Sequence, residues 1–272
     1  MTQATIGNPQ FSDDSAAARP RGAAMTRLLL SNEFGLAVLI AIAFVSFAIT
    51  LQGYTSPFSL FTIGRQIGID TMIGLAMMAV IVTGGLDLSV GAIGVCTAMF
   101  FGYLAQSAGL PLVLAVPGAI LFGAALGFIN GLAVVRSGVH SFIITLASMS
   151  IFFGVMIFLT KAQGFNQLPP SVASFGKMKL AGKVSVLLIF TLAVCAGLSV
   201  FYRFTTLGRR MLSAGANAKA AELSGVRTGW VIAACHTLTG GLAGLAALMV
   251  TARTGAAVSS MAGQLGQDWL LP

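Results

Sequence analysis

Apolar runs long enough to cross a membrane recur along most of this chain. Residues 34–51 contain no charged side chain and match the roughly 20 residues that a helix needs to span a hydrocarbon core. Only 8% of the residues are charged and 57% are hydrophobic, too few polar groups to cover a globular surface. The sequence therefore predicts an all-α fold, a polytopic bundle of transmembrane helices.

Seven spans are expected, separated by short polar stretches. Residues 1–33 are rich in Ala, Ser, Pro, Gly and charge, which predicts a disordered cytoplasmic tail, and residues 34–272 are expected to form one transmembrane domain. The sequence does not predict a cleaved signal peptide, because no apolar core followed by a small-residue cleavage site lies near the start. The apolar parts of the expected spans are residues 34–51, 71–82, 92–104, 112–135, 142–159, 184–201 and 230–250.

The net charge of +8 lies mainly in the N-terminal segment and the short loops, where basic residues mark topology and do not require nucleic acid binding. Arg19, Arg21 and Arg27 predict a cytoplasmic N-terminus. The basic loop 203–227 then also lies inside. The lysines of loop 161–183 lie outside, against the usual rule, and that loop is expected to be long and loose.

A break interrupts the apolar pattern at Gly84, Gly85, Asp87 and Ser89. Two adjacent glycines favour a kink or an unwound turn, and an aspartate is costly beside lipid. Asp87 and Ser89 either cap the helix that follows or take part in gating and solute contact. Both interpretations remain open from the sequence.

A polar island at residues 209–227 lies between two spans. Asn217 is a favoured helix N-cap, residues 218–223 are mostly strong helix formers, and Gly225 can end a helix in the left-handed conformation. The pattern predicts one short helix outside the membrane, either a solvated loop or a docking element.

No catalytic, cofactor or metal motif is found in the sequence. His140 and His236 have no second ligand at metal-binding spacing, so each is interpreted as a helix-end or packing residue. Cys96, Cys195 and Cys235 fit neither a disulfide framework nor a zinc site. Glycines 123, 127 and 131 recur every four residues, a spacing that favours close helix packing.

Three segments, in this order, stand out. Residues 84–91 read GGLDLSVG, Asn130-Gly131 is followed by FIITLASM at 142–149, and the third segment is residues 208–226. The first matches the signature Gly-Gly-Ile/Leu-Asp-Leu-Ser-Val-Gly, the second Asn-Gly with a Phe-Ile-x-Thr-Leu-x-x-Met block, and the third the loop Gly-x-Asn-x-x-Ala-Ala-x-x-Ser-Gly-Ile. In these three segments the chain resembles the permease family of ATP-binding-cassette importers for ribose, galactose, xylose, arabinose and related sugars, within the branched-chain amino acid/sugar permease superfamily.

The resemblance implies a transport subunit, not an enzyme, that moves a monosaccharide or related small polar solute across a bacterial inner membrane. It implies a coupling loop at 203–229 that docks on a separate cytoplasmic ATPase, a periplasmic solute-binding protein, and a second permease copy, identical or a sibling. Ala220 and Ala221 would permit close approach to the ATPase, and Glu222 could pair with a basic group on it. The residues expected to couple are Gly215, Asn217, Ala220, Ala221, Glu222, Ser224 and Gly225.

Two departures from the family pattern accompany the resemblance. Ser141 stands where many members have proline, and residues 266–272 look like the opening of a motif that normally leads into further spans. The alternatives are therefore a permease fragment without transport activity or an ion-coupled secondary transporter. The latter would need intramembrane carboxylates, for which Asp87 is the candidate.

Overall fold

The computed structural model describes residues 32–180 and 184–261, with side chains from residue 34 onward. The chain divides into two units, Met1–Ser56 and Pro57–Pro272, which are treated separately. The described part of the first unit is α2 (Asn32–Thr50) and the turn after it, where Tyr54 packs against the rings of Phe44 and Phe47. The expected disordered tail lies almost entirely outside the described residues.

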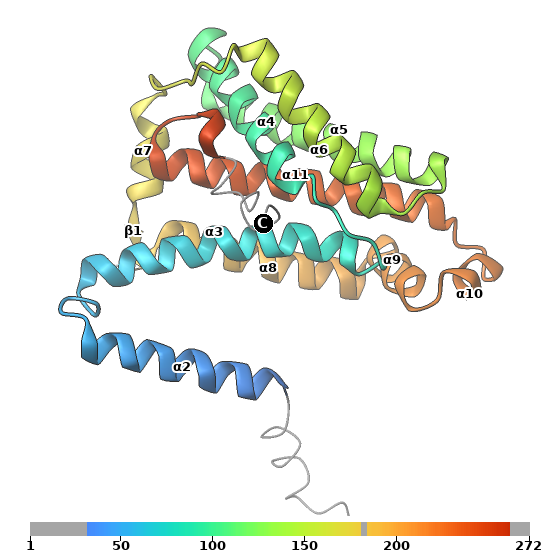
Figure 1. Cartoon of the computed structure of the whole chain (residues 1–272), viewed down its shortest axis with the longest axis horizontal. Coiled ribbons are helices and arrows are strands. Elements are labelled where there is room, and N and C mark those ends of the chain that lie inside the picture. Colours follow the sequence, from blue (N-terminus) through green and yellow to red (C-terminus); the bar gives the residue numbers. More distant parts are fainter. Residues whose placement is uncertain (1–31, 181–183, 262–272) are drawn as a thin grey trace, which may run out of the picture. The chain divides into compact units, whose positions relative to one another are not determined.

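The second unit is a bundle of helices with one small hairpin (Figure 1). In chain order its elements are α3 (Pro57–Ile81), α4 (Val90–Gly102) with a π-helical turn η1 (Tyr103–Ser107), α5 (Leu112–Ser137), α6 (Ser141–Thr160), α7 (Pro170–Lys177), the antiparallel strands β1 (Lys179–Leu180) and β2 (Val184–Ser185), α8 (Val186–Phe204), α9 (Thr206–Ala216), α10 (Ala218–Leu223) and α11 (Thr228–Thr254).

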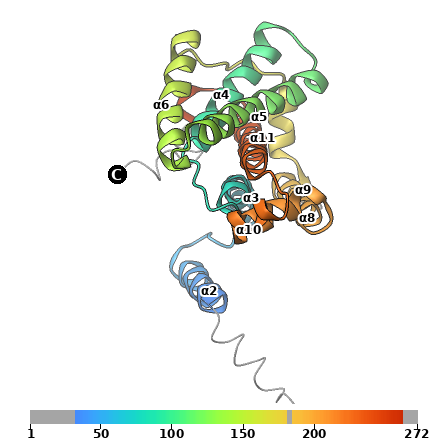
Figure 2. The ribbon, with the colours of Figure 1, turned by 90° about the vertical axis from the view of Figure 1, so that its right-hand side faces the viewer.

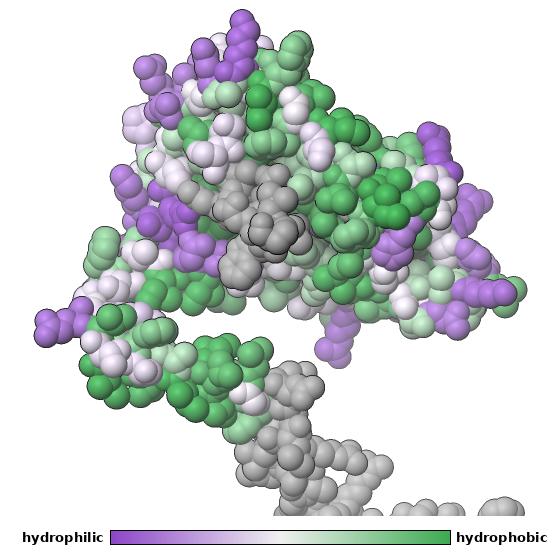
Figure 3. Space-filling view, viewed as in Figure 1, coloured by the Kyte–Doolittle hydropathy of each residue, from purple (hydrophilic) through white to green (hydrophobic). Residues whose placement is uncertain are grey.

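The predicted all-α membrane bundle is confirmed. Within the described residues, six helices are long and apolar enough to cross a membrane: α3, α4 with η1, α5, α6, α8 and α11. The first of the seven expected spans forms α2, whose described apolar part, Phe34–Thr50, is shorter than these six. In the second unit, apolar side chains cover much of the visible face and hydrophilic residues gather toward its edges (Figure 3).

Helix α11 is the centre of the second unit and packs against α3, α4 and α5 (Figure 2). Small residues make its contact with α5 close. A Cβ on Gly123 would lie 2.7 Å from the Gly240 carbonyl oxygen, and a Cβ on Gly131 would lie 2.7 Å from Ala233 Cα. The packing role predicted for the glycine stripe of α5 is therefore confirmed.

The segment 161–180 is more ordered than the sequence predicts. The expected loose loop contains α7 and strand β1, and Phe165 forms a two-way backbone pairing with Ala257, with N–O distances of 2.7 and 2.9 Å. Gly176 of α7 packs directly on the backbone of Ala252 in α11. The prediction was wrong because these contacts join residues 92 and 76 positions apart in the sequence, which local composition does not reveal.

Candidate functional site at the helix break

The chain leaves the helical conformation between α3 and α4, where the diglycine predicts a break. Gly84 has a φ of +80°, a conformation that residues with a Cβ rarely adopt. A Cβ on Gly85 would lie 2.8 Å from Val80 Cγ1 and 3.0 Å from Ser141 Oγ. Both glycines are needed for the turn that the structure shows.

Side chains at the start of α6 satisfy backbone amides that the break leaves open. The Leu86 N–H donates to Ser141 Oγ at 2.9 Å, and the Leu88 N–H donates to Thr145 Oγ1 at 3.1 Å. Irregular backbone at membrane depth is stable only where protein groups replace the missing helical hydrogen bonds. The first turns of α6 supply those groups.

Asp87 is the centre of a buried polar network. Its Oδ1 accepts hydrogen bonds from the Ser89 N–H at 2.9 Å and the Ser89 hydroxyl at 2.5 Å, and its Oδ2 lies 2.9 Å from His236 Nδ1 on α11. Asn130 of α5 donates from Nδ2 to Ser89 Oγ at 2.6 Å. All four side chains are at most 2% exposed, so the network joins the break to α5 and α11 inside the bundle.

The capping interpretation holds only in part: Asp87 satisfies one amide that the break leaves open, that of Ser89, but the Ser89 side chain does not cap α4. Ser89 occupies the N-cap position of α4, but no side-chain hydrogen bond caps that helix, because both polar side chains are engaged in the network. His140 does accept from the Phe142 N–H at the start of α6, as a helix-end residue would. For His236 the sequence predicts a helix-end or packing residue, and it is indeed buried within α11, but the sequence does not indicate its pairing with Asp87. A buried aspartate requires hydrogen-bond donors, so the few polar residues inside the apolar runs were the candidates for its partners.

Two atoms of this network have no hydrogen-bond partner in the part of the chain that the structure describes: Asn130 Oδ1 and His236 Nε2. Beside an ionised carboxylate, which only accepts, Nδ1 of His236 is the donor. His236 also lines a cavity of about 620 Å³ together with Gly84, Gly85, His140 and Ser141. Both unpartnered atoms are themselves buried, so the network keeps unused hydrogen-bonding capacity inside the bundle.

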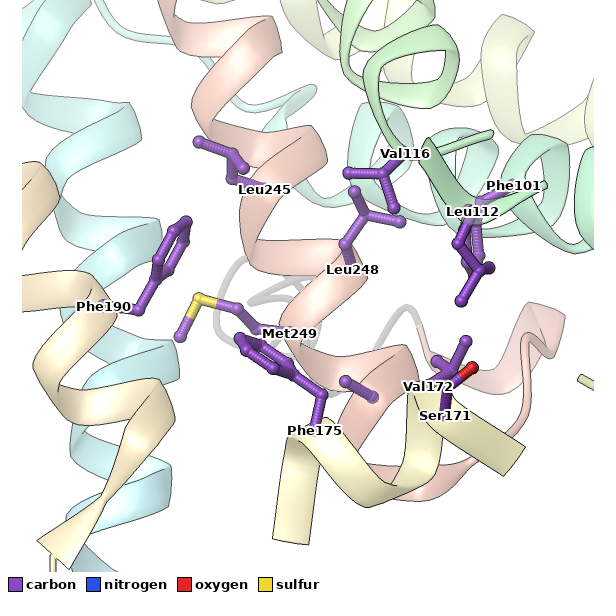
Figure 4. Close-up of a pocket in the computed structure, with 11 residues that line it drawn as sticks. Phe101, Leu112, Val116, Ser171, Val172, Phe175, Phe190, Leu245, Leu248 and Met249 are labelled. Atoms are coloured by element: carbon purple, nitrogen blue, oxygen red, sulfur yellow. The ribbon is translucent and has the colours of Figure 1, made fainter. Parts of the chain in front are cut away.

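No metal site is found among the described residues, in which no three His, Cys, Asp or Glu side chains cluster. A second cavity, of about 270 Å³, lies between α4, α5, α7, α8 and α11 and is lined almost entirely by apolar side chains such as Phe101, Leu248 and Met249 (Figure 4). It offers a polar solute little to bind.

The polar island forms two helices, where the sequence predicted one. The expected helix is α10: Asn217 Oδ1 accepts from the Ala220 N–H at 3.0 Å, and Gly225 has a φ of +82°. The preceding α9 was not predicted, although Thr205 caps it by accepting from the Gly208 N–H at 3.0 Å.

The residues expected to couple differ in their surroundings. Ala221 is buried against this chain's own residues and cannot closely approach a partner, and Glu222 accepts a hydrogen bond from the Thr228 hydroxyl. The Ser224 hydroxyl donates to the Ala220 carbonyl within α10. The backbone of Gly215 lies against Val82, just before the break. Asn217, Ala220 and Gly225 are exposed.

Comparison with known proteins adds independent information. Residues 59–271 match the family described as "Branched-chain amino acid transport system / permease component". The chain is 31% identical over 230 residues to the D-allose transport system permease protein AlsC of Escherichia coli (strain K12), covering 84% of this chain and 70% of AlsC.

Two further relatives are similar to most of this chain. It is 29% identical over 235 residues to the ribose import permease protein RbsC of Haemophilus influenzae, covering 85% and 72% of the two chains. It is 31% identical over 208 residues to the autoinducer 2 import system permease protein LsrD of Yersinia enterocolitica, covering 74% and 61%. No solved structure matches the chain.

Proposed function

This chain belongs to the family of branched-chain amino acid transport system permease components, and we propose that it forms a membrane subunit of an ATP-binding-cassette importer for a monosaccharide or related small polar solute. Like its relatives, it is a transport subunit and not an enzyme. The names of AlsC and RbsC, which refer to allose and ribose, support a sugar as the solute.

The exposed surface of α9 and α10 carries the proposal for the partner. Leu223, the last residue of α10, is 86% exposed, and Leu212 of α9 is about half exposed. The same segment carries exposed cations, at Arg209, Arg210, Lys219 and Arg227. Exposed leucines within a basic segment are expected where another protein covers them. We therefore assign this surface to the cytoplasmic ATPase.

The rest of the assembly follows from the same proposal. ATP-driven import requires a solute-binding protein outside the membrane. A second permease copy, identical or related, is expected because a paired ATPase offers two docking surfaces. The N-terminus then lies in the cytoplasm and the protein in a bacterial inner membrane.

Co-purification of the ATPase from membranes tests the docking surface. Leu223→Asp should lower the amount of retained ATPase about tenfold, because an apolar contact at the centre of an interface is replaced by a charge. The matched control is Met178→Asp, which changes an exposed apolar residue beside α7, at the opposite end of the second unit (Figure 1).

Met178→Asp should retain the ATPase at the wild-type level. Equal loss in both variants, or retention by Leu223→Asp, would contradict the assignment of this surface. Membrane levels of each variant, measured by immunoblot, separate loss of docking from loss of the protein.

A further inference from the structure

Helix α9 packs against the membrane-spanning helices through buried apolar side chains, whereas the last residue of α10, Leu223, is exposed. Met211 and Ala214 of α9 are buried in an apolar cluster with Val80 of α3, Tyr202 of α8, and Val231 and Cys235 of α11. Three spanning helices therefore contribute to the surface that holds α9. A force applied to α9 is expected to reach these helices without passing through a flexible loop.

One contact of α9 is made by backbone alone. A Cβ on Gly215 would overlap the carbonyl oxygen of Val82, lie 2.9 Å from the Val82 carbonyl carbon and lie 3.4 Å from Thr83 Cα. Any side chain at position 215 must push α9 away from this segment or distort it, because the obstacle is backbone and cannot rotate aside. The C-terminal end of α9 thus rests directly on the last residues before the break.

The contact is continuous with the polar network. Val82 is followed by a hydrogen-bonded turn, in which the Thr83, Gly84 and Gly85 amides donate to carbonyl oxygens of Val80 and Ile81 at 2.9–3.3 Å. Two residues further on, Asp87 pairs with His236 of α11. A displacement of Val82 therefore acts on a short hydrogen-bonded segment whose other end is joined to α11 at the centre of the bundle.

From this geometry we propose that Gly215 is a positioning residue for transport: its backbone contact with Val82 passes movements of the ATPase-docking surface to the helix break at 83–89. The proposal rests on the proposed function, because it needs an ATPase to move the loop. In this proposal Gly215 acts through its contact with Val82 and not by binding the solute. Its role is to let α9 lie close enough to Val82 that the two segments move together.

A first experiment needs no ATPase and uses the native thiol of Cys235, which is buried beneath α9. In a Cys96→Ala, Cys195→Ala background in membranes, Gly215→Ala should raise the rate of Cys235 labelling by N-ethylmaleimide about fivefold, since lifting α9 opens the cluster. The matched control is Gly197→Ala in α8, where an added Cβ meets nothing within 4 Å. Equal labelling of Gly215→Ala and wild type would overturn the contact on which the proposal depends.

A second experiment tests transmission in the complex with the ATPase. A Thr83→Cys reporter lies in the break and lines the cavity beside it. In the otherwise wild-type complex, ATP with vanadate should change its labelling rate about threefold, because the nucleotide selects one of two conformations. In Gly215→Ala the ATPase should co-purify normally while the labelling rate no longer responds to nucleotide.

The outcomes separate the two proposals. Retention of the ATPase by Gly215→Ala shows that the variant is folded, so a normal nucleotide response in it would overturn the inference and leave the proposed function standing. A wild-type chain that retains no ATPase would overturn the proposed function, and the inference with it. Loss of the ATPase in Gly215→Ala alone would assign this glycine to docking and overturn its role in transmission.

Discussion

Asp87 is stable inside the bundle because donors surround both of its oxygens. A buried carboxylate without partners is costly by several kcal/mol, and here the Ser89 amide, the Ser89 hydroxyl and the His236 ring replace water. Those donors come from two segments, the break and α11. The aspartate thus converts a local interruption of the helix into a fixed connection with the centre of the fold.

Replacing Asp87 with alanine should lower the free energy of unfolding by about 3–5 kcal/mol, because it leaves buried donors unpaired. Thermal unfolding of the detergent-purified protein measures the effect. Asp70→Ala, at an exposed position on α3, should cost less than about 1 kcal/mol. If the pair acts as a unit, Asp87→Ala with His236→Ala together should cost less than the sum of the two single changes. Additive effects would contradict that coupling.

Sequence reasoning located only one side of this pair. Asp87 was conspicuous because it is an acid within an apolar pattern, and this signal is local. His236 lies 149 positions later, and nothing in its own helix indicates a partner. Asn130 entered only through the resemblance to a family motif. Pairings of this kind depend on which faces of α5 and α11 meet, and periodicity does not determine that.

At the scale of helices, the contact between α5 and α11 depends on the absence of side chains. The backbone of Gly127 lies against the His236 carbonyl oxygen, and Gly240 of α11 lies against the Gly123 carbonyl oxygen. Lipid tails are as apolar as leucine, so helices in membranes associate through such close packing. The glycines of each helix therefore pack directly on backbone atoms of the other helix.

Gly127→Ala should therefore destabilise the protein by about 1–3 kcal/mol, since the added methyl group meets backbone that cannot move aside. Gly154→Ala in α6 is the matched control. Its Cβ would meet nothing within 4 Å, and alanine favours helix, so stability should be unchanged or rise by up to about 1 kcal/mol. Unfolding temperatures in detergent compare the two. Equal stability of both variants would show that the helices can separate at no cost.

Local signals explain which helices were foreseen. Helix α10 was predicted because its cap, Asn217, and its terminating Gly225 lie within a few residues of each other. Helix α9 was missed because its two glycines lower helix propensity, although Leu207, Met211 and Ala214 recur at helical spacing. It is held by the burial of Met211 and Ala214 against other helices, a tertiary effect.

At the scale of the second unit, its two ends differ in character. The break, the loop after α5, and helices α9 and α10 lie at one end, and α7 with the β1–β2 hairpin lies at the other (Figure 1). The first end carries the basic polar island. By the positive-inside rule we expect this end to face the cytoplasm.

Thiol labelling in intact cells tests this orientation. In a background without native cysteines, Lys161→Cys should react with a membrane-impermeant maleimide added outside, whereas Lys219→Cys should react only after the inner membrane is permeabilised. Both positions are exposed, so accessibility within the protein does not limit either reaction. The opposite pattern would invert the topology and place the proposed ATPase surface on the wrong side.

The contact between α5 and α11 also limits how this protein can change shape. Sliding one helix along the other by a single residue would carry a side chain beneath a carbonyl oxygen that now faces only a glycine. The two helices are thus locked in register and should travel as one piece. We expect any alternation between inward-facing and outward-facing forms to come from movement of the other helices around this pair.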